Sequence, residues 1–160
     1  MNANFINPFL SSITNVLKTM AMVGDIETGK ASLKTTETAS GAVSGVINMD
    51  GQPVSGSLAI SFSKEFICEV YQRMLGEEVD EINETVQDLV GELTNMVSGS
   101  AKTILSELGY DFGLATPHIL HGANHAIKHS IKGPKIIIPF KTVFGEFFVE
   151  TSFQTSVAIH

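Results

Sequence analysis

Two carboxylates and an amide, Asp88, Glu92 and Asn95, follow one another at intervals of four and three residues. On an α-helix such positions share one face, so the three side chains would form a polar line. The carboxylates can pair with a cation, whereas the amide both donates and accepts hydrogen bonds and can orient a water molecule. Gly91 and Gly99 flank this line, although glycine costs about 1 kcal/mol relative to alanine inside a helix. We interpret the two glycines as room for the backbone or surface of a partner.

A long helix is predicted to carry this polar line, from about Asn83 to Leu108 with Gly109 as its stop. Its apolar positions recur at helical spacing: Val86, Leu89, Val90, Leu93, Met96, Val97, Ala101, Ile104, Leu105 and Leu108. The polar line lies nearly opposite this apolar stripe and is expected to face solvent. Periodicity alone also fits an ordinary solvated face with glycines that merely pack, because every amphipathic helix has a polar face.

Two further helices are predicted on the same grounds. The first covers residues 4–22, with Pro8 in its first turn. The second covers residues 64–75, with Ser63 as its N-cap and Gly76 as its end. Both carry apolar residues at helical spacing, so both are expected to bury one face.

Strands account for most of the rest of the chain. The predicted strands are 42–49, 54–62, 115–122, 135–141 and 142–153. A turn is expected at 50–53, and Pro139 indicates a sheet edge or a bulge. Residues 24–40 are open between strand and loop. No linker divides the chain, so we predict a single domain over 1–160, an α/β chain of the α+β type in which helices cover an antiparallel sheet.

Composition narrows the classes of function. The 160 residues are 43% hydrophobic and 17% charged, with a formal net charge of -7. That balance fits a globular chain and argues against a nucleic-acid binder, which needs a basic face. No segment is long and apolar enough to span a membrane, and the first residues lack the pattern of a signal peptide, so a cytoplasmic location is expected. The lone Cys68 is interpreted as a small buried hydrophobe.

The polar line belongs to a larger pattern. The run Asp88-x-x-x-Glu92-x-x-Asn95, followed by Pro117 after about twenty residues, resembles the signature of the CheC/CheX/FliY phosphatases of bacterial chemotaxis. Further stretches resemble CheX proteins and extend the likeness over most of the chain: 5–9, 45–47, 56–62 and 139–140. The resemblance is strongest to the CheX branch, and it implies a CheC/CheX-like, pseudo-symmetric single domain.

The resemblance also implies a chemistry. Members of this family act on the aspartyl phosphate of a CheY-like response regulator. Glu92 would pair with the partner's lysine, and Asn95 would orient the attacking water. Asp88 would occupy the first position of the motif, and Pro117 would shape the neighbouring segment. From their place on the helix, we assign Asp88, Gly91 and Gly99 to the surface that binds the partner. Mg²⁺ is expected on the response regulator, so this chain would need no cofactor of its own. CheX members are homodimers, which makes a homodimer the expected state.

Two alternatives stay open, a docking module and a metal site, whereas a second active site is not expected. A non-catalytic dimeric module could dock a response regulator or a flagellar switch component without turnover. A second motif on the first helix would read Pro8-x-x-x-Ser12-x-x-Asn15, which lacks both acids, so we expect no second active site there. The histidines could bind a metal, although structural or surface roles are favoured because no cysteine or acid accompanies them: His118, His121, His125 and His129.

Overall fold

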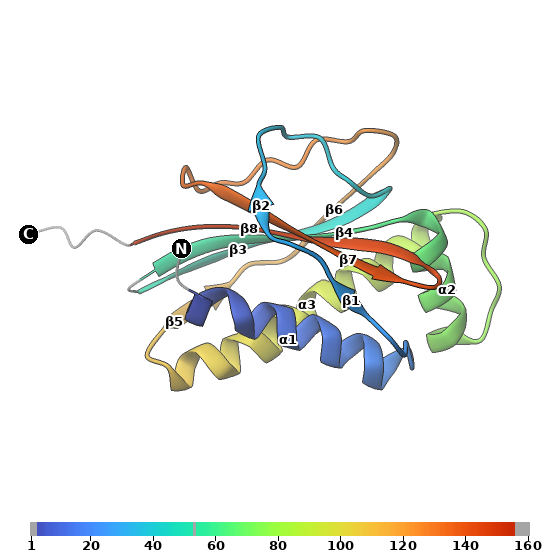
Figure 1. The fold of residues 1–160 in the computed structure, drawn as a ribbon, viewed down its shortest axis with the longest axis horizontal. Helices are drawn as coiled ribbons and strands as arrows, with labels where there is room; N and C mark the ends of the chain where they lie inside the picture. The colour runs from blue at the N-terminus through green and yellow to red at the C-terminus, as the bar shows by residue number, and fades with distance from the viewer. Residues whose placement is uncertain (1–2, 53, 156–160) are drawn as a thin grey trace, which may run out of the picture.

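The computed structural model describes residues 3–52 and 54–155, which form a layered α+β fold (Figure 1). An antiparallel sheet lies in the middle, with helices α1 (Ala3–Met20) and α3 (Glu84–Glu107) packed together on one face. Helix α2 (Lys64–Leu75) lies at one end of the sheet. The predicted fold class is confirmed. No helix within the described ranges combines the length and hydropathy needed to cross a bilayer.

The sheet brings together strands that are far apart in the sequence. Its strands are β1 (Glu27–Thr28), β2 (Ser32–Leu33), β3 (Val43–Gln52), β4 (Val54–Phe62), β5 (Asp111–Leu114), β6 (His118–His121), β7 (Lys135–Thr142) and β8 (Gly145–Thr155). They hydrogen-bond in the order β1-β7-β8-β4-β3-β5, with β2 also paired to β7 and β6 also paired to β3. The last described strand, β8, therefore lies in the interior of the sheet, between β7 and β4.

The main core lies between the helices and the sheet. Its largest fully buried side chains include Phe5, Phe9, Phe62, Phe66, Phe140, Phe147, Ile13, Leu17, Ile47, Leu58 and Ile60. Phe5 is only 1% exposed, and its ring contacts those of Tyr110 and Phe112. Helix α1 begins at Ala3, one residue before its predicted start, and the prediction that Pro8 lies in the first turn is wrong: Pro8 lies inside the helix. The burial of Phe5 and Phe9 offsets the backbone hydrogen bond that a proline removes.

The predicted limits of the other two helices are confirmed. The side chain of Ser63 caps α2 by accepting from Phe66 N at 3.3 Å, and Gly76 ends the helix in the left-handed region at φ 78°. Asn83 caps α3 in the same way, accepting from Val86 N at 3.0 Å. Both caps satisfy backbone groups that the first turn leaves unpaired, which is why short polar residues stand there.

The structure differs from the predicted strands and turns in three places. The expected turn at 50–53 is instead mostly strand, because β3 continues to Gln52 and pairs there with β5; Pro53 lies outside the described residues. Strand β5 itself was not predicted, since its sequence Asp-Phe-Gly-Leu is short and carries no long alternation. The segment expected at 115–122 shortens to β6. Residues 24–40, left open between strand and loop, contain the short strands β1 and β2. Both pair with β7 on the side away from β8, one on each side of Pro139.

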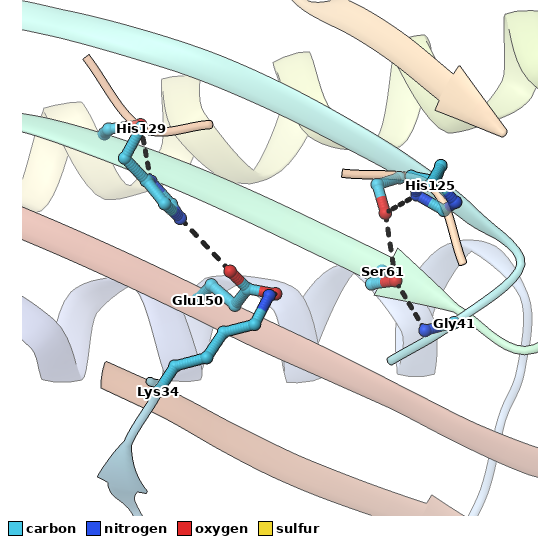
Figure 2. Close-up of polar contacts among 8 residues, drawn as sticks. Lys34, Gly41, Ser61, His125, His129 and Glu150 are labelled. Carbon is cyan, nitrogen blue, oxygen red and sulfur yellow. Dashed lines mark hydrogen bonds and ion pairs between the residues drawn. The ribbon is translucent and has the colours of Figure 1, made fainter. Parts of the chain in front are cut away.

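The second face of the sheet is covered by two irregular segments, 34–42 and 122–134 (Figure 1). Glu150 of β8 is fully buried beneath them, and its carboxylate accepts from Lys34 Nζ at 2.6 Å. His129 lies on the other side, with Nε2 3.1 Å from Glu150 and Nδ1 2.8 Å from Ser57 Oγ (Figure 2). One buried carboxylate thus ties both cover segments to the interior strands.

Candidate functional site

Helix α3 holds the predicted polar line at the surface. Asp88, Glu92 and Asn95 are all exposed, while Leu89 and Leu93 are buried on the opposite side of the helix. Among the described residues, none of the three polar side chains takes part in a hydrogen bond or an ion pair. Their polar atoms are therefore free to bind a group from outside the chain.

These three side chains line a groove of about 520 Å³ between α3 and the segment that enters β6. The α3 wall consists of Glu84, Gln87, Asp88, Gly91, Glu92 and Asn95, and the far wall of Thr116, Pro117 and Ile119. The fold thus brings Pro117 to the same groove as the three helix positions, although Asn95 and Pro117 are separated by the end of the helix and by β5.

Strand pairing places the far wall. In the β3–β6 ladder Ile119 stands opposite Gly45, which carries the Ile119 side chain to α3. A Cβ built at Gly91 would lie 3.6 Å from Ile119 Cδ1, an ordinary van der Waals distance. Packing within the chain therefore does not require glycine at position 91, and its missing side chain leaves the wall of the groove open.

The groove is acidic. Glu84, Asp88 and Glu92 contribute three carboxylates, and its lining residues include neither lysine nor arginine. The formal net charge of -7 has the same sign. An isolated anion would be repelled, whereas a partner that brings its own cations beside a phosphoryl group would be attracted. Asn95 contributes an uncharged amide beside these carboxylates, and the amide can accept from and donate to a water.

Not all of the predicted site residues line the groove. Gly99 does not line the groove, and a Cβ built there would meet nothing within 4 Å. Glu84 was missed although it stands one helical turn before Asp88, so extending the polar line by a turn would have found it. Thr116 and Ile119 were also missed, because only the pairing of β6 with β3 brings them to the helix.

The corresponding stretch of α1 lacks the acid of the α3 site. Ser12 is 2% exposed, and its Oγ has no hydrogen-bond partner among the described residues. Asn15 is exposed and lines a separate hollow with Lys18 and Thr28. The amide of Asn15 therefore has no neighbouring carboxylate at the spacing that Glu92 and Asn95 have on α3.

The four histidines are not gathered in one place. His118 and His121 are exposed at the two ends of β6. His125 packs on the sheet, with Nε2 2.7 Å from Ser44 Oγ, and His129 contacts Glu150 (Figure 2). Within the described residues, no group of three or more His, Cys, Asp and Glu side chains could hold a metal ion. His125 and His129 make polar contacts with the sheet, whereas His118 and His121 face solvent.

Cys68 is less buried than predicted. It is half-buried against the main core rather than fully buried. Burial raises the pKa of the Cys68 thiol, with Lys64 opposing that effect. Since the thiolate is the reactive form, this shift disfavours a nucleophilic role for the side chain.

The fold and the groove define a CheC-like protein, with a sheet covered by two helices and an exposed acid and amide on one of them. The chain belongs to the CheX family, because the family model described as "Chemotaxis phosphatase CheX" matches residues 43–141.

Individual relatives agree with this assignment. The "CheY-P phosphatase CheX" of Thermotoga maritima is 28% identical over 129 residues, covering 80% of this chain and 82% of the relative. A CheC-like superfamily protein from Shewanella sp. PV-4 is 50% identical with a TM-score of 0.89, covering 96% of this chain and 99% of that one. CheX of Borrelia burgdorferi, solved with CheY, BeF3 and Mg²⁺, is 29% identical with a TM-score of 0.77, covering 94% and 97%.

Proposed function

We propose that this protein binds a phosphorylated CheY-like response regulator and hydrolyses its aspartyl phosphate. One observation carries the proposal: Glu92 and Asn95 stand exposed and uncommitted on the wall of an open groove. Exposed side chains whose polar atoms have no partner within the chain can enter the phosphorylation pocket of another protein. The activity would terminate chemotaxis or two-component signalling in the cytoplasm.

The chemistry asks little of this chain. In our proposal, Glu92 pairs with a lysine of the response regulator, and Asn95 holds a water in line with the phosphorus. The water oxygen bonds to phosphorus while the bond from phosphorus to the aspartate oxygen breaks. The products are inorganic phosphate and the free aspartate carboxylate, and the water's proton passes to phosphate or solvent. Because phosphoryl transfer passes through a loose transition state, positioning supplies most of the help.

The relatives support the partner and the source of its metal. The Thermotoga relative is named for activity on CheY-P, and the Borrelia complex contains CheY, BeF3 and Mg²⁺ together. We assign Mg²⁺ to the response regulator in this case as well. The acidic groove suits that division, since its three carboxylates would face a partner whose lysine and metal are positive. This chain then needs no cofactor of its own.

The first test follows the decay of a phosphorylated CheY-like regulator. Wild-type protein is expected to accelerate the decay, and Asn95→Ala to remove about 10²-fold or more of that acceleration, because the water loses its holder. Asn15→Ala is the matched control, since it removes an exposed amide from α1 where no acid accompanies it. Equal activity of Asn95→Ala and Asn15→Ala would contradict the assignment.

Glu92→Ala is expected to weaken binding as well as rate, because an ion pair to the partner is lost. Binding can be measured by calorimetry with the BeF3-treated regulator. We expect the dissociation constant to rise clearly for Glu92→Ala and little for Asn95→Ala. An unchanged dissociation constant for Glu92→Ala would show that this carboxylate does not contact the partner.

The rival function is a non-catalytic module that docks a response regulator or a flagellar switch component. Its sign would be tight binding of the phosphorylated regulator together with a decay rate that wild-type protein leaves unchanged. The free Asn95 amide favours the enzyme, because docking alone gives no reason for an uncommitted water-binding group beside Glu92.

A further inference from the structure

A sheet glycine lies directly beneath the catalytic stretch of α3. A Cβ built on Gly45 of β3 would lie 2.0 Å from Thr94 Oγ1 and 3.1 Å from Thr94 Cβ. Both residues are fully buried or nearly so, and Thr94 immediately precedes Asn95. At this point, therefore, the helix approaches the sheet more closely than any side chain at position 45 would allow.

The opposite arrangement occurs one turn earlier on the same helix. There the glycine is on the helix, at position 91, and the side chain that faces it, Ile119, comes from the sheet. The two contacts are neighbours, because Gly45 and Ile119 pair directly across β3 and β6. Thr94 fits over Gly45 while Ile119 faces Gly91, so α3 and the far wall of the groove are held against each other at adjoining points.

We propose that Gly45 and Thr94 are positioning residues for the phosphatase reaction, setting the depth of α3 against the sheet. This inference rests on the proposed function. The depth of the helix decides how far Asn95 stands above the far wall, and so where it meets the partner's phosphoryl group. Gly45 and Thr94 touch neither partner nor water and act through the position of α3.

The side chain of Thr94 is held in one conformation and keeps α3 at a set distance from the sheet. Its Oγ1 donates to Val90 O at 2.7 Å, which fixes the side chain in the rotamer that points at Gly45. A methyl at position 45 would also lie 3.3 Å from Val90 Cγ1, a contact that a shift of a few tenths of an ångström relieves, so the Thr94 oxygen is the main obstacle. Because the hydrogen bond to Val90 O opposes rotation of Thr94, we expect the backbone of α3 to shift away from position 45. A displacement of about 1 Å in a reacting group can cost on the order of 10²-fold in rate.

The test is the steady-state dephosphorylation of the response regulator by Gly45→Ala. Its kcat is expected to fall about tenfold or more, because the water on Asn95 is displaced, while KM changes little, because Glu92 and the groove remain. Gly45→Ala/Thr94→Ala removes the oxygen at 2.0 Å and is expected to recover most of the lost kcat. A second core substitution ordinarily adds to the loss of stability, so recovery would identify the Thr94 oxygen as the cause of the lost kcat.

Gly133→Ala serves as the matched control. A Cβ there would lie 2.6 Å from Phe153 O, so it too disturbs a close contact, but within the cover segment 122–134. It is expected to lower stability and leave kcat unchanged. A kcat for Gly45→Ala within twofold of wild type, or a double variant no faster than Gly45→Ala, would overturn the inference.

Two safeguards keep the outcome readable. If Gly45→Ala does not fold, Thr94→Ala removes the same contact from the helix side and is expected to lower kcat at nearly unchanged KM; an unchanged kcat would again overturn the inference. If wild-type protein itself leaves the decay rate unaltered, the proposed function fails first. If wild-type protein and Gly45→Ala are equally active, the proposed function stands and only the positioning role is contradicted.

Discussion

Single residues in the groove differ in whether the chain itself needs them. Glu92 and Asn95 have no described internal partner, and Gly91 has room for a methyl group. In contrast, Thr94 between Glu92 and Asn95 is fully buried and hydrogen-bonded. Positions that the fold does not require are those where a substitution can report on the partner without disturbing the chain.

Gly91→Ala is expected to leave the fold intact and to weaken partner binding several-fold. The new methyl would meet Ile119 Cδ1 at an ordinary 3.6 Å, and alanine favours the helix over glycine by about 1 kcal/mol. Thermal unfolding should therefore show equal or higher stability, while calorimetry with the BeF3-treated regulator shows a larger dissociation constant.

Gly99→Ala provides the comparison for Gly91→Ala. It gives the same gain in helix propensity, but it adds its methyl outside the groove lining, where nothing lies within 4 Å. We expect it to affect partner affinity less than Gly91→Ala does. Equal effects of the two substitutions would mean that the partner's contact extends along the helix beyond the groove.

The residues of α3 could be predicted from the sequence because their relation is local. Positions 88, 92 and 95 must share a helix face wherever that helix lies in the fold. Thr116 and Ile119 could not be predicted, since their place depends on the pairing of β6 with β3 across seventy residues of chain or more. Gly45 belongs to a stretch that resembles CheX proteins, but its close approach to Thr94 could not be predicted, because it depends on how the helix packs on the sheet.

Among the elements, the cover segments on the second face depend on a few polar contacts. Lys34 follows β2, and His129 lies in the segment before β7, yet both reach Glu150 of β8. The side chains of Lys34 and Glu150 are 7% and 1% exposed. A buried charge is costly without its partner, so this cluster holds both segments down more firmly than surface ion pairs would.

Glu150→Ala is expected to lower the free energy of unfolding by about 3–5 kcal/mol, since it leaves Lys34 buried without a counter-charge. Urea unfolding followed by circular dichroism would measure this. Glu146→Ala, at an exposed position of the same strand, is the control and should cost about 0.5 kcal/mol or less. A loss as small as that for Glu150→Ala would show that the cluster contributes little.

Elements with strong local signals were predicted well, and those fixed by distant contacts were not. The ends of α2 and α3 follow from caps that lie beside them in the sequence. The start of α1 was predicted to within one residue, but Pro8 lies inside the helix rather than in its first turn, and Phe5, which precedes it, packs against Tyr110 and Phe112 far along the chain. The end of β3 runs past its turn signal because β5 supplies hydrogen bonds there. In both cases tertiary contacts outweighed the local preference.

For the whole molecule, assembly stays a prediction from the family. We propose a homodimer, with exposed strand edges or α1 as candidate contact surfaces; β5 ends the strand order on one side and leaves an edge for pairing. Sedimentation equilibrium is expected to give twice the single-chain mass of 17.2 kDa. A mass equal to that of the single chain at micromolar concentrations would contradict this state.

The interior place of β8 has a consequence for how the molecule comes into being. While the ribosome is still adding residues before position 145, β4 has no neighbour on one side, and Lys34 and His129 have no acid to meet. Most pairings of the sheet link distant parts of the chain, a topology that folds slowly. This sheet therefore cannot be completed until β8 has left the ribosome, and chaperones can bind the unfinished sheet in that interval.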